Sequence, residues 1–283
     1  RGIRVTGSEL VGLLPLRVLL NAADHYLRKQ QRSLGISEAE KVKIAVKSLG
    51  LDDLAPFDPS KRVIEYIISE EGNSPLIHMT LTQFVDTTAS EAPAPGGGSI
   101  SAYAGALGAA LATMVANLSA HKRGWDDRWE AFSAHAEKGL ALQNQLMALV
   151  DADTQAFDAI MAAHGMPKGT ADQKAKRHQA IQDATRNAID IPMQVAQVAH
   201  DGLGLAAAMA SDGNPNSVTD AGVGAMCLRT AVLGAVLNAR INCGDLEDTD
   251  YVAHIQSRCA KLVASAKSQE GEVLATVDRV MTG

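Results

Sequence analysis

Aromatic residues are scarce in this sequence. They make up 4% of its 283 residues, whereas hydrophobic residues make up 46%, and alanine is abundant. A core with few rings has to be filled by Ala, Leu, Val and Met side chains. Because small side chains let helices approach closely, this composition favours an all-α fold.

Cysteines and metal-ligand patterns are also few. The three cysteines, Cys227, Cys243 and Cys259, form no CxxC pair. An odd number of separated cysteines indicates reduced thiols and a cytoplasmic protein rather than a disulfide framework. The eight histidines show no HxxxH or HxH spacing with carboxylate partners. We therefore predict no metal site.

The sequence also lacks an excess of positive charge, and we expect it to lack long apolar runs. We expect no segment to reach the roughly 20 apolar residues that a membrane helix needs, and hence no membrane association. The net charge of −6 disfavours a general nucleic-acid role. An anionic ligand would have to be captured by a local basic patch or by helix N-termini.

Helix signals recur along the chain, whereas no convincing strand alternation follows residue 80. Residues 70–74 are polar, contain Gly72 and form the best linker candidate. We predict an all-α protein, with a partial, mostly helical domain over residues 1–75 and an up-down bundle of long helices over 76–283. Capping, proline and glycine signals place helices at about residues 15–30, 37–50, 58–67, 99–120, 126–163 and 217–242, with others starting at Thr80, Thr170, Pro192 and Asp248.

The first candidate for chemistry is a glycine-rich turn. Residues 95–99 read Pro-Gly-Gly-Gly-Ser and enter a predicted helix. Glycines let the backbone approach a ligand, and the helix N-terminus adds partial positive charge. The turn either binds a carboxylate or polarised carbonyl, or is a flexible connection between helices. It is not a Walker loop, because no Gly-Lys-Ser/Thr follows.

A second candidate is Asp153, which falls on an apolar helical stripe. Leu146, Val150, Phe157 and Ile160 follow the same rhythm, whereas Asp151 and Asp158 fall off it. A carboxylate that faces a core is costly unless it is paired or its pKa is raised. Asp153 is thus a candidate acid/base, or else a structural acid that caps a helix or pairs with a buried Arg.

Polar residues at the two ends of one predicted helix form the third candidate. Asp220 follows Ser217 by three residues, where it can complete a helix cap. Asn238 and Asn242 are four residues apart and share a face. Two amides on a face of small residues can recognise a flat heterocycle, or can form hydrogen bonds between helices, which is the commoner outcome.

The fourth candidate is a basic run formed by Lys168, Lys174, Lys176 and Arg177. Such a run can bind an anionic group. A solvated helix face is the usual explanation, so both interpretations stay open.

Several of these segments resemble the cyclodeaminase domain of the formimidoyltransferase-cyclodeaminase family. The resemblance covers about residues 80–280 and rests on residues 92–99, 150–153 and 166–168 and on Asn238 with Asn242. One departure is Thr219, where the family often has Ser before the Asp.

The N-terminal segments resemble the end of a glutamate formimidoyltransferase, at residues 5–15 and 56–66. We place the junction with the cyclodeaminase domain near residues 70–80. The part with the transferase's catalytic histidine is not in this sequence, so we do not expect transferase activity from this chain alone. The chain also does not begin with Met, and we expect it to be part of a longer bifunctional protein.

The resemblance implies a cytoplasmic, dimer-based homo-oligomer of histidine breakdown that binds no nucleic acid or membrane. It would close 5-formimidoyltetrahydrofolate to 5,10-methenyltetrahydrofolate with release of ammonia. The tetrahydrofolate that carries the formimidoyl group would be polyglutamylated. The alternative is a non-catalytic helical domain that oligomerises and presents folate.

On this resemblance we assign a role to each candidate residue. Acid/base catalysis falls to Asp153 first and Asp220 second, and orientation of the pterin falls to Asn214, Asn238 and Asn242. The residues expected to bind a polar edge of the substrate are Gly96, Gly97, Gly98 and Ser99, and those expected to bind the glutamate tail are Lys168, Lys174, Lys176 and Arg177.

Overall fold

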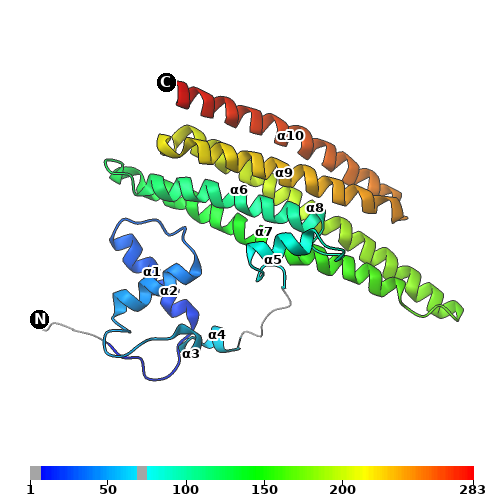
Figure 1. Ribbon diagram of the computed structural model, residues 1–283, viewed down its shortest axis with the longest axis horizontal. Helices are drawn as coiled ribbons and strands as arrows, with labels where there is room; N and C mark the ends of the chain where they lie inside the picture. The colour runs from blue at the N-terminus through cyan, green and yellow to red at the C-terminus, as the bar shows by residue number, and fades with distance from the viewer. Residues whose placement is uncertain (1–7, 69–74) are drawn as a thin grey trace, which may run out of the picture. The chain divides into compact units, whose positions relative to one another are not determined.

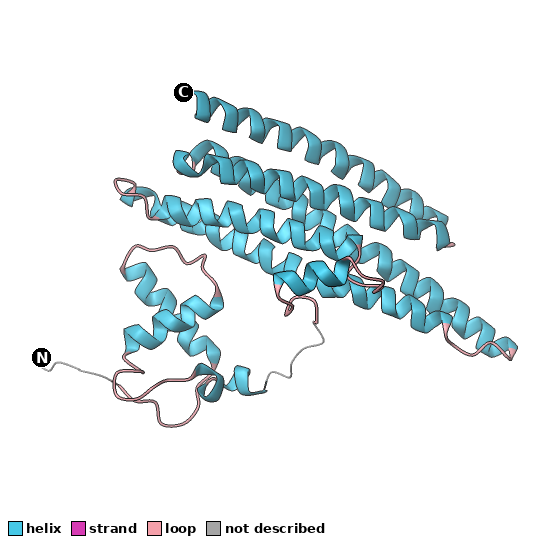
Figure 2. Ribbon diagram, viewed as in Figure 1, coloured by secondary structure: helices cyan, strands magenta, loops and turns pink. Residues whose placement is uncertain are grey.

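Helices form nearly all of the regular structure in this protein. The structure, a computed structural model, describes residues 8–68 and 75–283. Within these ranges there is no strand, and one isolated bridge joins Leu14 to Val63 (Figure 2). The all-α prediction is confirmed, while the predicted linker at residues 70–74 lies outside the described residues. The helices are α1 (Leu16–Lys29), α2 (Glu38–Leu49), α3 (Pro59–Arg62), α4 (Ile64–Ile68), α5 (Leu81–Thr88), α6 (Gly97–Ala120), α7 (Trp129–His164), α8 (Ala171–Asp212), α9 (Val218–Asn242) and α10 (Thr249–Thr282).

Local capping signals placed most helix starts correctly. Thr80 and Thr170 each form the full capping box that begins α5 and α8. Asp248 accepts the Tyr251 N–H at 3.0 Å at the start of α10. Ser217 does precede α9, but its side chain makes no capping hydrogen bond. These bonds join residues two or three apart, which is why a sequence pattern predicts them.

The prediction that Pro192 starts or kinks a new helix was wrong in one respect, because α8 runs through it without ending. A proline inside a helix leaves the carbonyl four residues earlier without its N–H partner. That carbonyl belongs to Ala188, and the Asn242 Nδ2 of α9 donates to it at 2.9 Å. A side chain from another helix thus replaces the missing bond.

Contacts divide the chain into two units, and the first holds residues 1–73 and 116–140. Its core lies between α1, α2 and the Leu14–Val63 bridge. In the same unit the loop at Leu34 and Gly35 bonds to the Ser133 Oγ at 2.9 Å and to the Asn117 Nδ2 at 2.9 Å. The predicted boundary at residue 75 stays a prediction. The buried core residues are Leu14, Leu19, Ala23, Val42, Ala45, Val46 and Val63.

The second unit, residues 74–115 and 141–283, contains α8, α9 and α10 and the larger parts of α6 and α7 (Figure 1). Helix α9 packs against α8 and α10, and it meets α6 through small residues. A Cβ added at Gly108 would lie 2.7 Å from the Gly224 carbonyl oxygen, and one at Gly234 would lie 2.2 Å from the Ser101 Oγ. The two backbones are therefore close, which explains the alanine- and glycine-rich composition.

Two helices are more apolar than the sequence analysis expected. Residues 97–120 and 215–245 are long and apolar enough, by length and composition alone, to cross a membrane. In the fold, 61% and 50% of these segments are buried. Core helices of a globular unit pass the same test, because close packing against neighbours requires small apolar side chains.

Candidate active site

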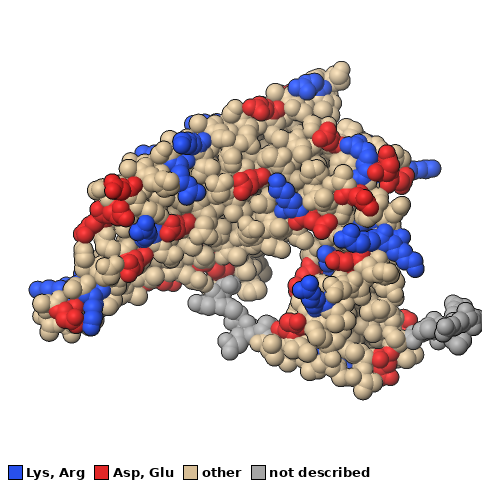
Figure 3. Space-filling model, turned by 180° about the vertical axis from the view of Figure 1, so that it is seen from behind, with Lys and Arg blue, Asp and Glu red and all other residues tan. Residues whose placement is uncertain are grey.

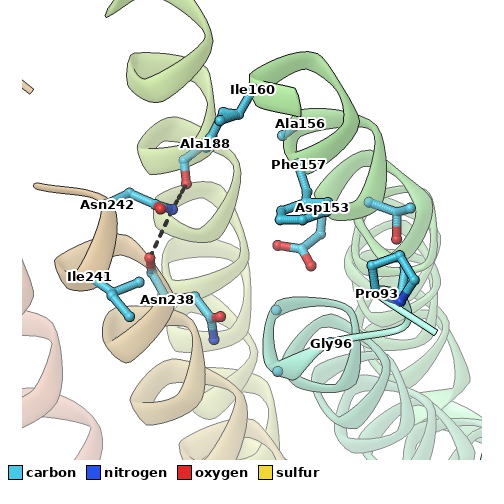
Figure 4. A pocket seen from close by; sticks show the side chains of 14 residues that line it. Pro93, Gly96, Asp153, Ala156, Phe157, Ile160, Ala188, Asn238, Ile241 and Asn242 are labelled. Atoms are coloured by element: carbon cyan, nitrogen blue, oxygen red, sulfur yellow. Dashed lines mark hydrogen bonds between the residues drawn. The ribbon is translucent and has the colours of Figure 1, made fainter. Parts of the chain in front are cut away.

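A pocket of about 270 Å³ opens within the second unit, between the turn before α6 and the helices α7, α8 and α9 (Figure 4). Six of the predicted site residues meet there. A cavity of this size accepts the reacting part of a small molecule better than a whole cofactor. The lining residues are Pro93, Ala94, Gly96, Gly97, Gly98, Asp153, Thr154, Ala156, Phe157, Ile160, Ala188, Asn238, Ile241 and Asn242.

Asp153 projects its carboxyl group into this pocket from α7. Leu146 and Val150, earlier on the same stripe, are fully buried, so the stripe leaves the core at Asp153. Burial raises the pKa of the Asp153 carboxyl group, and hydrogen bonds from Ser99 partly oppose that rise. A carboxyl group whose pKa is raised in a pocket is suited to accept and return a proton.

Asp151 departs from the sequence expectation, because it is more deeply buried than Asp153. Its side chain is 3% exposed and accepts the N–H groups of Leu76 at 2.9 Å and Ile77 at 3.3 Å. The helical pattern placed Asp151 off the apolar stripe. Periodicity within α7 gives no information on the segment at Leu76 and Ile77, which covers Asp151 in the fold. Of the two neighbouring acids, Asp151 is structural and Asp153 faces the pocket.

The glycine turn brings backbone directly against the Asp153 carboxyl group. A Cβ added at Gly98 would lie 2.0 Å from the Asp153 Oδ1, and one at Gly97 would lie 3.2 Å from the Asn238 Nδ2. No side chain fits at Gly98 without moving the carboxyl group. Gly96 has nothing within 4 Å of such an atom. The requirement for glycine is therefore specific to the first turn of α6, and the turn is more than a flexible connection.

Ser99 does not line the pocket, and the expectation that it contacts substrate stays a prediction. The residue is fully buried, and its Oγ donates to the Asp153 Oδ2 at 3.1 Å. It lies in the first turn of α6, whose inward face packs on α7. Its partner in the fold is thus the acid.

Asn238 and Asn242 both line the pocket, but part of each amide is committed to the fold. The Asn242 Nδ2 donates to the Ala188 carbonyl at 2.9 Å and the Asn238 carbonyl at 3.1 Å (Figure 4). The Asn238 Nδ2 donates to the Gly234 carbonyl at 2.9 Å. The interpretation as bonds between helices is therefore correct for Asn242.

Asn214 and Asp220 do not reach this pocket within one chain. They lie at or just before the start of α9, whereas Asn238 lies near its end. Eighteen residues separate Asp220 from Asn238, about 27 Å along a helix axis. The Asn214 side chain accepts the Asn216 N–H at 3.2 Å in the turn before α9. The helix predicted over residues 217–242 already implied this separation, because Asp220 and Asn238 both lie on it, near its opposite ends.

The predicted basic run lies at the junction of α7 and α8, away from the pocket. Lys176 pairs with Asp172 at 3.0 Å. Arg177 donates to the His164 carbonyl from Nε at 3.2 Å and from Nη2 at 3.0 Å, which caps the end of α7. Lys174 lies fourteen residues, or about 21 Å of helix, before Ala188 in the pocket.

Apolar residues of the pocket wall were missed as site residues. Phe157, Ile160 and Ile241 line it, and Phe157 is 42% exposed. The signal was present, because Phe157 and Ile160 follow Asp153 on one stripe that we took to face the core. Periodicity alone does not separate a core face from a pocket wall.

Across residues 8–68 and 75–283, no group of three or more His, Cys, Asp or Glu side chains is placed to hold a metal ion. The absence of a metal site stays a prediction.

Profiles of known families match most of the chain. A profile described as Formiminotransferase-cyclodeaminase matches residues 80–261, and one described as Formiminotransferase domain matches residues 1–69. The formimidoyltransferase-cyclodeaminase of Rattus norvegicus is 36% identical over 275 residues, which are 97% of this chain and 51% of that protein. The chain thus spans about half the length of this relative.

A shorter relative and a solved structure match the helical part. The methenyltetrahydrofolate cyclohydrolase of Methylorubrum extorquens is 35% identical over 198 residues, 70% of this chain and 95% of that protein. The crystal structure of a formiminotetrahydrofolate cyclodeaminase from Thermotoga maritima superposes with a TM-score of 0.64 at 24% identity, over 72% of this chain and 98% of that one. At this identity the structural likeness establishes the fold.

Proposed function

The chain belongs to the formiminotransferase-cyclodeaminase family, and we propose that its helical unit closes 5-formimidoyltetrahydrofolate to 5,10-methenyltetrahydrofolate with release of ammonia. The resemblance read from the sequence is confirmed by the family match over residues 80–261. The observation that carries the proposal is Asp153, a carboxyl group with a burial-raised pKa that faces a pocket in the matched region.

The reaction needs one group that first accepts a proton and later donates one. The folate N10 attacks the formimidoyl carbon on N5, and a base takes the N10 proton as the bond forms. The tetrahedral centre then expels its exocyclic nitrogen, which leaves as ammonia once it is protonated. Asp153 serves as the base in the first step and the acid in the second. As a carboxylate it also stabilises the cationic methenyl product.

The remaining pocket residues divide into a polar and an apolar side. The amides of Asn238 and Asn242 and the backbone at Gly97 and Gly98 orient the pterin. On the apolar side, Phe157, Ile160 and Ile241 contact the flat rings of the substrate. A few polar groups that fix orientation against an apolar wall are typical of small-molecule sites.

A direct assay tests the proposal. The full chain would be mixed with 5-formimidoyltetrahydrofolate near neutral pH, and the methenyl product and ammonia would be measured separately against a protein-free control. We expect both products to appear in equal amounts. If the folate binds and neither product exceeds the control, the chain presents folate without turning it over, which is the non-catalytic alternative.

A second candidate activity is hydrolysis of 5,10-methenyltetrahydrofolate, which the similarity to a methenyltetrahydrofolate cyclohydrolase favours. Water would add to the same carbon that loses ammonia in the first reaction, and Asp153 would take a proton from that water. The bond from this carbon to N5 would then break as the added hydroxyl loses its proton and N5 gains one, which leaves a formyl group on N10. Supplying the methenyl compound and following its decay distinguishes the activities. Faster decay than in the protein-free control would favour the hydrolase.

We also propose that the substrate carries a polyglutamate tail and that the α7–α8 junction holds it. Lys168 and Lys174 are exposed there, and neither has an ion-pair partner among the described residues. Arg177 caps α7 and Lys176 pairs with Asp172, so these two contribute less. At the projecting end of this unit, positive and negative side chains lie beside one another (Figure 3), and such exposed contacts are individually weak.

Charge reversal tests the tail site. Lys168→Glu combined with Lys174→Glu should raise KM for a polyglutamylated substrate several-fold more than for the monoglutamate, with kcat nearly unchanged, because the tail is remote from the reacting carbon. High salt should weaken wild-type binding of the long tail in the same way. The matched control is Lys261→Glu with Lys267→Glu on α10. Equal KM changes for both substrates would mean that the basic run is only a solvated face.

Homo-oligomerisation through one face of α6 and α9 is a further part of the proposal. Large apolar side chains on that face are exposed, up to 66% at Leu237 and 75% at Ile241, and contiguous apolar patches mark interaction sites. A second copy would also be a means of bringing Asn214 and Asp220 to a pocket. The exposed residues are Ile100, Leu107, Met114, Val223, Met226, Leu237 and Ile241.

Light scattering measures the oligomer directly. Leu107→Asp combined with Met226→Asp should reduce the wild-type mass to that of one chain, because two charges cannot be buried unpaired in an apolar interface. Met281→Asp, an exposed apolar site at the end of α10, serves as the control and should not change the mass. A double variant that keeps the wild-type mass would exclude this face as the interface.

The biological setting follows the same family assignment. We propose that the chain acts in the cytoplasm, in histidine degradation, as part of a bifunctional enzyme that also transfers the formimidoyl group. The match of residues 1–69 to a formiminotransferase domain supports the pairing of activities. The three cysteines are free thiols, in keeping with a reducing compartment.

A further inference from the structure

The Ser99 hydroxyl has an environment that binding of substrate does not explain. It is fully buried at the first turn of α6 and lies 3.1 Å from the Asp153 Oδ2. The Ser99 backbone N–H also acts to lower the pKa of this carboxyl group. The Ser99 hydroxyl thus donates to the proposed acid/base from a helix N-terminus, where partial positive charge favours an anion.

Thr154 extends this contact toward the pocket. It follows Asp153 on α7 and lines the pocket, and its Oγ1 lies 3.4 Å from the Ser99 Oγ. An ionised carboxylate only accepts hydrogen bonds, so the Ser99 hydroxyl must donate to it, and its own oxygen is then left to accept from Thr154. The three groups form a directed chain from Thr154 through Ser99 to Asp153.

A hydroxyl can also serve the protonated acid. When Asp153 carries a proton on Oδ2, that O–H donates to the Ser99 oxygen, and the Ser99 hydroxyl turns toward Thr154. Neither protonation state leaves a buried polar atom without a partner. Amide or alkyl side chains do not offer this exchange, and an acid that must be base and then acid in one cycle needs it.

We propose that Ser99, assisted by Thr154, is a positioning residue that holds the Asp153 carboxyl group at the pocket edge and adapts to both of its protonation states. The inference deepens the proposed function, on which the catalytic part of it rests. The neighbouring Gly98 leaves room for the same carboxyl group, because a Cβ added there would lie 2.0 Å from the Asp153 Oδ1.

The first test measures the titration of the Asp153 carboxyl group in the absence of substrate. In the intact chain, labelled carboxyl carbons would be titrated by NMR in the wild type, Ser99→Ala and Thr154→Val, with Asp153→Asn to assign the signal. Loss of the Ser99 hydroxyl should move the titration of Asp153 to higher pH, and Thr154→Val should move it less in the same direction. Thr113→Val is the control, because the Thr113 hydroxyl is buried on α6 but bonds only to the Ala109 carbonyl of its own helix at 2.7 Å.

The second test reads turnover. The acid limb of kcat/KM reports the base of the free enzyme. In Ser99→Ala this limb should move to higher pH, and kcat/KM at its acid end should fall on the order of tenfold, as expected for one lost hydrogen bond to a charged group. Ser99→Cys keeps the size of the side chain but donates weakly, so it should behave like Ser99→Ala.

The outcomes separate the two ideas. An Asp153 titration that is the same in Ser99→Ala as in the wild type would overturn the inference, whatever the activity. A shifted titration supports the positioning role even if the wild-type chain does not turn over the folate, a result that would count against the proposed function alone. A shift of the same size in Thr113→Val would overturn the inference by showing a general effect of lost buried hydroxyls.

Discussion

Replacing Asp153 with Asn should lower kcat by about 10²-fold or more while the fold stays intact. The amide keeps the shape of the side chain but can neither accept the N10 proton nor return one to the departing nitrogen. It also removes the negative charge that faces the cationic product. Steady-state kinetics with 5-formimidoyltetrahydrofolate measure the loss of kcat. Circular dichroism and a melting curve show whether the fold is intact.

The pH dependence gives an independent check on Asp153. Burial raises the pKa of this carboxyl group, so the wild-type acid limb of kcat/KM should lie above the range of an ordinary aspartate, and the residual activity of Asp153→Asn should lack that limb. Asp158→Asn is the matched control, because Asp158 is exposed on the same helix. Wild-type turnover by Asp153→Asn would remove the assignment and make Asp220 the residue to replace next.

Replacing Gly98 with Ala should be nearly as damaging, although it adds a single methyl group. The new Cβ would lie 2.0 Å from the Asp153 Oδ1 and 2.5 Å from Oδ2, closer than any tolerated contact. Either the carboxyl group rotates away from Ser99 or the first turn of α6 moves. A displacement of about 1 Å in a catalytic group can cost about 10²-fold in rate. We expect kcat/KM to fall by that order.

A pair of other glycines separates this clash from a general effect of substitution. Gly204 lies within α8 and has nothing within 4 Å of an added Cβ, so Gly204→Ala should keep activity and raise the melting temperature through better helix propensity. Gly96→Ala meets no atom within 4 Å either, and it should lose far less activity than Gly98→Ala. Equal losses at Gly96 and Gly98 would show that flexibility of the turn, not the approach to Asp153, requires glycine.

The structural and catalytic roles of neighbouring acids could be told apart only in the tertiary structure. Asp151 and Asp153 are two residues apart, and the helical pattern favoured Asp153 as the acid on the apolar stripe. The structure buries Asp151, because the segment at Leu76 and Ile77 covers it with two N–H donors, whereas Asp153 is half-buried and lines the pocket. Helical periodicity describes only the helix that carries the two acids. It had no information on the chain 75 residues earlier.

The sequence by itself determined the all-α class, most helix boundaries and the presence of Asp153 on the stripe that leads to the pocket. These features depend on bonds between residues two to four apart and on side-chain periodicity, which a sequence displays directly. The capping boxes at Thr80 and Thr170 are the clearest cases.

Only the tertiary structure decided which polar residues act together. It pairs Asp153 with Ser99, 54 residues away, and the carbonyl freed by Pro192 with Asn242. Such pairings depend on how long helices pack side by side, and packing is set by the summed contacts of many small side chains rather than by any local motif.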